Sequence, residues 1–206
     1  DVIDYKHCSP VDRVFTARGA INAMEHYNDG TESLLVCATS TSHVHGFDFR
    51  AKAEAFLLNN SGHAGAITSM VVDPARHWLL TGTVRGCYTC WDLRFHIPVA
   101  SWWQPGPDNQ IHRMVYRQGT SFLASVGNGD VFEWEVAEQK PKAVWQVLSS
   151  DPRRSASQTP VLPKLDASTS APNPQAYAER LRNMPPHNRT HRALVMVPDA
   201  NYFLTG

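Results

Sequence analysis

The sequence lacks several features that would mark other classes of protein. Its 206 residues carry 19 Lys and Arg against 19 Asp and Glu, so no net basic charge favours nucleic acid or an anionic membrane. No apolar run approaches the roughly 18 residues of a membrane-spanning helix, and the N-terminus does not have the pattern of a signal peptide. Four cysteines, scattered between Cys8 and Cys90, are too few for a secreted disulfide framework. We therefore expect a cytoplasmic protein.

What the sequence does contain is a repeat. An aromatic residue followed by an acidic one recurs at Phe47-Asp48, Trp91-Asp92 and Trp134-Glu135, with spacings of 44 and 43 positions. Short apolar runs, broken by turn residues, precede each pair in the same register. A period of this length with four short strands per unit is typical of the blades of a β-propeller.

The second copy of the repeat is the clearest. It opens with Gly62 and His63, passes through apolar runs at 67–72 and 78–80, turns at Gly86 and reaches Trp91 and Asp92 before a last run at 97–103. This GH…WD frame is the signature of a WD40 blade. The sequence thus predicts an all-β fold, a fragment of a WD40 propeller, in which the structural blade marks are Gly62, His63, Gly86, Trp91, Asp92 and Trp134.

The repeat divides the chain into segments. We assign 19–60, 61–108 and 109–148 to three blades of one propeller, 149–190 to a proline-rich insertion between blades, and 191–206 to the start of a further blade. The insertion holds seven of the fourteen prolines and has a net charge of +3, a composition typical of a solvated loop. Because a propeller closes with about four to eight blades, we expect the chain to be a piece of a longer polypeptide.

The sequence offers no recognisable catalytic, cofactor or metal site. It has no GxSxG turn, no GxxxxGK(S/T) loop, no HExxH helix and no HRD or DFG motif. Cys87 and Cys90 form a CxxC pair, but no second pair completes four zinc ligands, and positions three apart on a strand point to opposite faces. His43 and His45 have no evident third ligand. We expect core cysteines and two polar histidines at a blade edge.

The turn between the second and third strands predicts where partners bind. WD40 blades usually carry an aspartate there, which joins a histidine, a hydroxyl and the tryptophan in a hydrogen-bond network, but the second blade has Arg85. We expect an incomplete network and an outward-facing arginine. Because strand directions alternate, the turns at Arg85 and Asn128 and the connection after Trp102 and Trp103 should emerge on one face. Adjacent tryptophans cannot point into the same layer, so one of them should be exposed. Arg85, Trp102, Trp103 and Asn128 are the candidate partner-binding residues.

The run from Trp78 to Trp102, WLLTGTVRGCYTCWDLRFHIPVASW, resembles the WD40 region of one family. This is the vacuolar protein-sorting 15 family, the regulatory, pseudokinase-bearing subunit of class III phosphatidylinositol 3-kinase. The family's GTS-x-G turn and WDLRF extension match 81–86 and 91–95, with Val84 in place of the serine.

The resemblance implies a long cytoplasmic scaffold with a kinase-like domain, helical repeats and a C-terminal seven-bladed propeller. It also implies assembly with the lipid kinase and a coiled-coil subunit, in autophagy and in endosomal or vacuolar sorting. The protein would reach endosomal or autophagic membranes through that complex, and this segment itself would catalyse nothing.

Two alternatives stay open on the residues alone. The first is a generic WD40 adaptor of another multiprotein complex, such as a ubiquitin ligase or a chromatin assembly. The second is an enzymatic propeller, against which the lack of acid and metal clusters weighs. The sequence upstream of Asp1 would separate them, because kinase-like motifs followed by helical repeats would favour the regulatory subunit.

Overall fold

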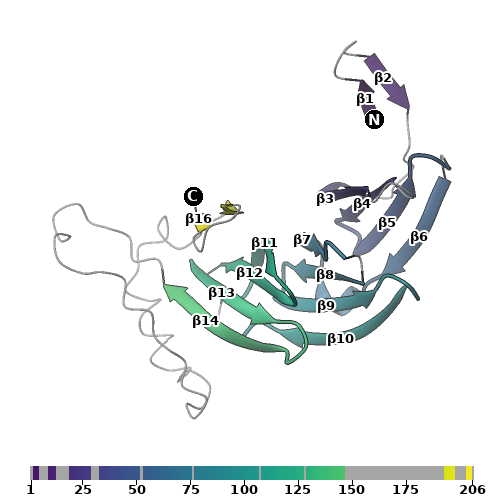
Figure 1. Ribbon diagram of the computed structural model, residues 1–206. Helices are drawn as coiled ribbons and strands as arrows, with labels where there is room; N and C mark the ends of the chain where they lie inside the picture. The colour runs from purple at the N-terminus through teal and green to yellow at the C-terminus, as the bar shows by residue number, and fades with distance from the viewer. Residues whose placement is uncertain are drawn as a thin grey trace.

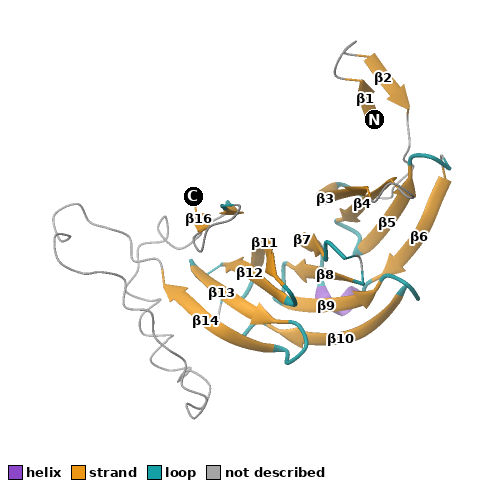
Figure 2. Ribbon diagram, in the orientation of Figure 1, coloured by secondary structure: helices purple, strands orange, loops and turns teal. Residues whose placement is uncertain are grey.

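A computed structural model describes residues 2–4, 9–12, 19–28, 33–51, 53–75, 77–106, 108–127, 129–146, 193–197 and 203–205. Figures 1 and 2 show that these residues form strands, turns and one short 3-10 helix. The strands make three four-stranded antiparallel sheets and two hairpins. The all-β prediction is therefore confirmed.

Each four-stranded sheet follows the chain from one strand to its neighbour, as a propeller blade does. Blade one consists of β3 (Ile21–Asn28), β4 (Ser33–Thr39), β5 (His43–Asp48) and β6 (Ala53–Asn59). Blade two consists of β7 (Ile67–Val72), β8 (Trp78–Thr83), β9 (Cys87–Asp92) and β10 (Ile97–Trp103). Blade three consists of β11 (Ile111–Gln118), β12 (Ser121–Val126), β13 (Asp130–Glu135) and β14 (Lys140–Gln146).

The remaining elements are short. β1 (Val2–Asp4) pairs with β2 (Ser9–Asp12), and β15 (Leu194–Met196) pairs with β16 (Phe203–Thr205). The 3-10 helix η1 (Gly62–Ala64) lies in the connection between blades one and two. Figure 1 shows β15 and β16 beside blade three, where Leu194 is buried against Leu123 and Val131.

The blades are held together by apolar residues from adjacent sheets. Phe56 and Leu58 of blade one pack with Leu79 and Trp91 of blade two. The approach of blades two and three is just as close, since a Cβ atom built on Gly82 would lie 2.7 Å from a methyl carbon of Ile111. A single blade of four short strands cannot bury its own faces, so each blade depends on its neighbours for stability, as repeat units do.

An aromatic cluster forms the centre of the contact between blades two and three. The ring of Tyr88 lies 5.6 Å from that of Trp102, 5.6 Å from that of Phe122 and 5.3 Å from that of Trp134. The buried Tyr88 hydroxyl donates a hydrogen bond to Gln104 Oε1 at 2.7 Å. Burial raises the pKa of Tyr88 well above its ordinary value, so this donor keeps its proton. Trp102 and Trp134 thus lie between blades two and three, as large rings in the repeat predict.

Candidate partner-binding face

One end of the sheets gathers the turns between second and third strands together with the connections between blades. The N–H of Val84, in the β8–β9 turn, donates to the carbonyl of Ala66 at 2.9 Å, and the N–H of Gln104 donates to the carbonyl of Gly86 at 2.7 Å. The turn at 84–86 is therefore bonded to the connection before blade two and to the one after it. We call this turn and the described residues of the two connections, 60–66, 104–106 and 108–110, the turn face. Strand alternation predicted that the turns and connections would emerge at one end, and these two bonds show it for the turn of blade two and the connections on either side of it.

Arg85 is exposed at the centre of the turn face. Its Nη1 donates to the backbone carbonyl of His63 at 3.1 Å, and its aliphatic stem crosses Gly65, where an added Cβ would meet Arg85 Cγ at 3.2 Å. Among the described residues the guanidinium makes this single hydrogen bond. Arg85 is thus anchored to the preceding connection and keeps donors available to a ligand of the turn face.

The hydrogen-bond network of blade two is partial, as expected from the missing aspartate. Trp91 is 3% exposed, and its Nε1 donates to Thr81 Oγ1 at 3.4 Å, while Thr81 Oγ1 donates to the carbonyl of Thr89 at 3.3 Å. His63 is exposed on η1, and its ring makes no hydrogen bond to any residue that the structure describes. The hydrogen bond between the tryptophan and the hydroxyl group is therefore present. In place of a bond to the histidine ring, Arg85 bonds to the backbone carbonyl of His63.

The glycine marks differ in what they do. Gly86 has a φ of 82°, and a Cβ there would lie 2.6 Å from the carbonyl oxygen of Asn109, so this turn requires glycine. Gly62 is exposed, and nothing lies within 4 Å of the place where its Cβ would be. Gly86 therefore fixes the close approach of the turn to the following connection, whereas Gly62 has no such packing constraint.

The adjacent tryptophans separate as the alternation predicts. Trp102 is 8% exposed and packs on Tyr88, whereas Trp103 is 55% exposed at the end of β10 that borders the turn face. Trp102 is therefore corrected from a candidate binding residue to a core residue, because it points toward blade three. Asn128 lies outside the described residues. Trp134 is buried in the same aromatic cluster as Trp102.

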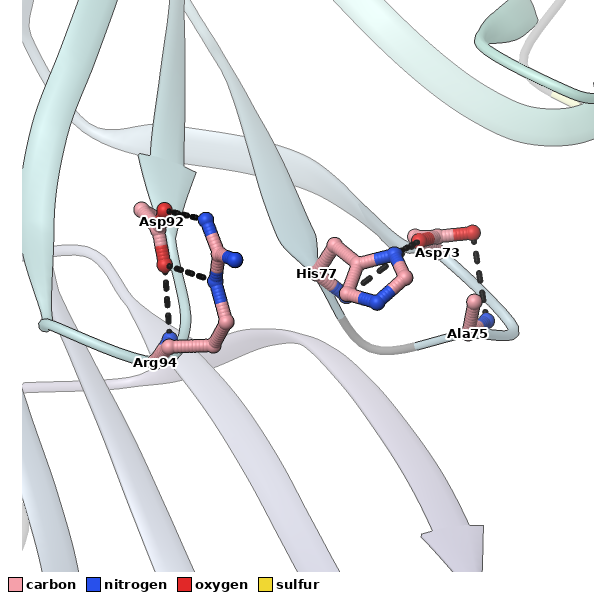
Figure 3. Close-up of polar contacts among 5 residues, drawn as sticks. All are labelled: Asp73, Ala75, His77, Asp92 and Arg94. Atoms are coloured by element: carbon pink, nitrogen blue, oxygen red, sulfur yellow. Dashed lines mark hydrogen bonds and ion pairs between the residues drawn. The ribbon is translucent and has the colours of Figure 1, made fainter.

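Asp92 lies at the opposite end of blade two, as the last residue of β9 before the β9–β10 turn (Figure 3). It accepts hydrogen bonds from the backbone N–H, Nε and Nη2 of Arg94 at 2.8, 3.1 and 2.5 Å. These bonds, the side-chain ones first, lower the pKa of Asp92 to about 2. Asp73 does the same work in the adjacent turn, where it accepts from the N–H groups of Ala75 and His77, both at 3.2 Å. Asp92 and Arg94 of the WDLR motif thus stabilise a turn, a local role that the sequence analysis did not predict.

The cysteines and histidines that the sequence analysis considered as metal ligands pack in the core or bond to neighbouring side chains. Cys87 and Cys90 are buried, and burial raises the pKa of the Cys90 thiol to about 11, as expected for core cysteines. His45 Nδ1 lies 2.6 Å from Glu54 Oε1, and His43 Nδ1 lies 3.1 Å from Thr41 Oγ1. In the described ranges, no three His, Cys, Asp or Glu side chains gather as a metal site would require. The same ranges contain no helix with the length and apolar character needed to cross a bilayer.

Comparison with curated proteins finds VPS15 kinases among the relatives of this chain. The chain is 43% identical over 100 residues to a probable serine/threonine-protein kinase vps15 of Dictyostelium discoideum, which covers 48% of the chain and 5% of the relative. It is 33% identical over 89 residues to the serine/threonine-protein kinase VPS15 of Arabidopsis thaliana (42% of the chain, 6% of the relative). For the Saccharomyces cerevisiae VPS15 kinase the identity is 35% over 79 residues (38% and 5%). The chain thus matches about one twentieth of the length of these relatives. No family model matches the sequence.

Solved structures identify the fold. The WD40 repeats of RRP9 align with a TM-score of 0.57 over 65% of this chain and 41% of that chain, at 13% sequence identity. U3-55K aligns with a TM-score of 0.58 over 66% and 42%, also at 13% identity. The WD40 fold predicted from the GH…WD frame is therefore confirmed, and so is the resemblance to the vacuolar protein-sorting 15 family predicted from blade two.

Proposed function

We propose that this chain is part of a WD40 propeller that serves as a non-catalytic protein-interaction scaffold in the regulatory subunit of a class III phosphatidylinositol 3-kinase complex. The observation that carries the proposal is the similarity of about half of the chain to VPS15 kinases, at up to 43% identity. The matched part is about one twentieth of those proteins, and we assign the kinase activity in their names to residues that this chain does not match.

The proposed organisation follows the predicted segments. Residues 19–60, 61–108 and 109–148 are three blades, 149–190 is an insertion between blades, and 191–206 begins a further blade of a seven-bladed propeller. The paired strands β3–β6, β7–β10 and β11–β14 support the three blades, and the β15–β16 pair supports the further one. The insertion lies outside the described residues.

The turn face is the proposed docking surface for the other subunits, the lipid kinase and the coiled-coil subunit. Arg85 supports this assignment because it is exposed and donates only one hydrogen bond within the described chain. Trp103 supports it because it is half exposed at the end of β10 that borders the turn face, and exposed tryptophans are common anchors of protein interfaces. Through these subunits the protein would act in autophagy and endosomal or vacuolar sorting, in the cytoplasm and at the membranes to which the complex is recruited.

The test is co-purification of the intact protein with the lipid kinase and the coiled-coil subunit. Arg85→Ala and Trp103→Ala should each weaken recovery of at least one subunit. Arg94→Ala and Phe95→Ala are matched controls, because they remove an exposed arginine and an exposed aromatic residue at the opposite end of blade two.

Two results would contradict the proposal. If Arg85→Ala and Trp103→Ala leave the assembly as strong as the controls do while the propeller stays folded, the turn face is not the docking surface. If the unaltered protein recovers neither subunit, the chain is a WD40 adaptor of a different complex.

A further inference from the structure

The outer strands of the three blades match residue for residue. The first residue of β10, Ile97, lies opposite Asp92, and the first residue of β14, Lys140, lies opposite Glu135. In both strands the regular pairing is interrupted just after the residue that lies opposite the tryptophan of the neighbouring strand. The β6 strand pairs with β5 in the same way. The three sequences therefore align without gaps as AEAFLLN, IPVASWW and KPKAVWQ.

In this alignment, β10 has large apolar residues at its first, third and last positions, where the other two strands have none, whereas at the fifth position β6 exposes Leu57 and β10 has Ser101. Ile97 is 50% exposed, Val99 is 56% exposed and Trp103 is 55% exposed. The same positions are Ala53, Ala55 and Asn59 in blade one, and Lys140, Lys142 and Gln146 in blade three. Two blades fold with small or polar residues here, so packing within a blade does not explain the large apolar residues of β10.

The backbone of β10 is open along the same stretch. β10 is an edge of its sheet, and no described strand pairs with its outer side. The bond from Gln104 N–H to Gly86 fixes which backbone groups turn inward, since these alternate along a strand. Gln104 and Trp102 turn theirs toward β9, so the N–H and C=O groups of Ser101 and Trp103 face the open side.

The charge on the two edges indicates what could pair with each. Proteins commonly protect edge strands with lysine. β14 follows this rule, because its edge carries Lys140 and Lys142, and Lys142 forms an ion pair with Glu135. β10 carries no charge from Ile97 to Trp103. An uncharged apolar strand therefore complements this edge. The charged groups of a charged strand would lose water on binding without gaining an ion pair, which would weaken its binding.

We propose that the outer edge of β10, from Val99 to Trp103, binds an uncharged extended segment of a partner protein, which pairs with β10 as a fifth strand. The added strand would bond to the outward groups of Ser101 and Trp103. Its side chains, alternating between faces, would reach Ile97 on one face and Trp103 on the other, which is the usual geometry of strand addition. Pro98 and the irregularity beside it confine regular pairing to the second half of β10. This surface is the rim of the propeller, and it meets the turn face only at Trp103.

The probe is a fluorescein-labelled peptide, Ser-Thr-Val-Thr-Val-Thr-Val-Thr-Ser, titrated into the intact protein and followed by fluorescence anisotropy. Val99→Lys, which copies the residue of β14, should weaken its binding at least ten-fold. Ala55→Lys, the same change at the matching position of blade one, should leave binding unchanged. In hydrogen exchange, the peptide should slow the amides of Ser101 and Trp103, whereas the amide of Gln104, already bonded to Gly86, should not change.

A second peptide keeps the test independent of any variant. Methylation of the amide nitrogens on one edge of the peptide removes its backbone donors and leaves its side chains in place, so it should bind at least ten-fold more weakly. Equal binding of the two peptides would overturn strand pairing in favour of side-chain contact. An absence of binding would overturn the site, and concentration-dependent dimerisation abolished by Val99→Lys would instead make the edge an interface between copies of this chain. Arg85 lies outside β10, so the peptide result with Val99→Lys and the co-purification result with Arg85→Ala can fail separately.

Discussion

Blades two and three match strand for strand, and their outer strands pair in the same register, yet they diverge at several positions where a side chain reaches the solvent. Trp91 and Trp134 occupy equivalent buried places and are 3% and 2% exposed. On the outer strands, by contrast, Val99 stands where blade three has Lys142. Packing between blades constrains the buried positions, and the exposed positions are free to differ. Function in this fold is therefore to be sought in what one blade has and its neighbour lacks.

Loss of the repeat tryptophans should have the largest effect, and a similar one in both blades. Trp91→Ala and Trp134→Ala should each lower the free energy of unfolding by about 3–5 kcal/mol, because each removes a buried ring from a contact between blades. Urea denaturation of the intact protein measures this. A loss below about 1 kcal/mol in one blade only would break the equivalence of the two blades.

Alanine substitutions at two turn glycines should separate the stability cost of a left-handed backbone from the cost of a steric clash. Gly86→Ala should cost about 2–3 kcal/mol, because it combines a left-handed φ of 82° with a clash against the Asn109 carbonyl. Gly119→Ala in blade three should cost only about 1 kcal/mol, because its φ is 58° and no atom lies near its Cβ position. Thermal unfolding of both variants gives the difference, and equal losses would show that the Asn109 connection moves aside.

Arg85 should matter little for stability. It is exposed and makes one hydrogen bond to a backbone carbonyl, so Arg85→Ala should change the free energy of unfolding by about 0.5 kcal/mol or less. The urea series used for Trp91→Ala provides the comparison. A loss approaching that of Trp91→Ala would make Arg85 part of the blade's framework and would remove the main reason to place it on a binding surface.

The smallest expected effect is a pH dependence that belongs to the β9–β10 turn. The folded pKa of Asp92 is about 2, below the ordinary 3.8, so its ionised form stabilises the fold above that ordinary value. This contribution is lost as the pH falls from about 4 through about 2. Asp92→Asn should therefore be slightly less stable than the unaltered protein at pH 7 and equally stable near pH 2. A difference that persists at pH 2 would mean that the carboxylate charge is not its source.

The sequence predicted the parts of the fold that repeat. The spacing of Phe47, Trp91 and Trp134 was enough to predict the three blades, because a period in the sequence is a period in the structure. It also predicted that one of Trp102 and Trp103 would be exposed, from strand alternation alone. It could not say which, since that depends on the direction in which blade three lies. The pairing of Arg94 with Asp92 was missed because the WD motif was read as a blade mark rather than as a turn.

By itself, then, the sequence determined the class of fold, the boundaries of β7 and β10 and the family that blade two resembles, because all three depend on local pattern and spacing. Only the tertiary structure decided which residues are available to a partner. Burial of Trp102, anchoring of Arg85 on the His63 carbonyl and the open backbone at Ser101 each depend on a neighbouring blade or strand. Contacts between segments distant in the chain leave no periodic signal, and those contacts set the exposure on which binding depends.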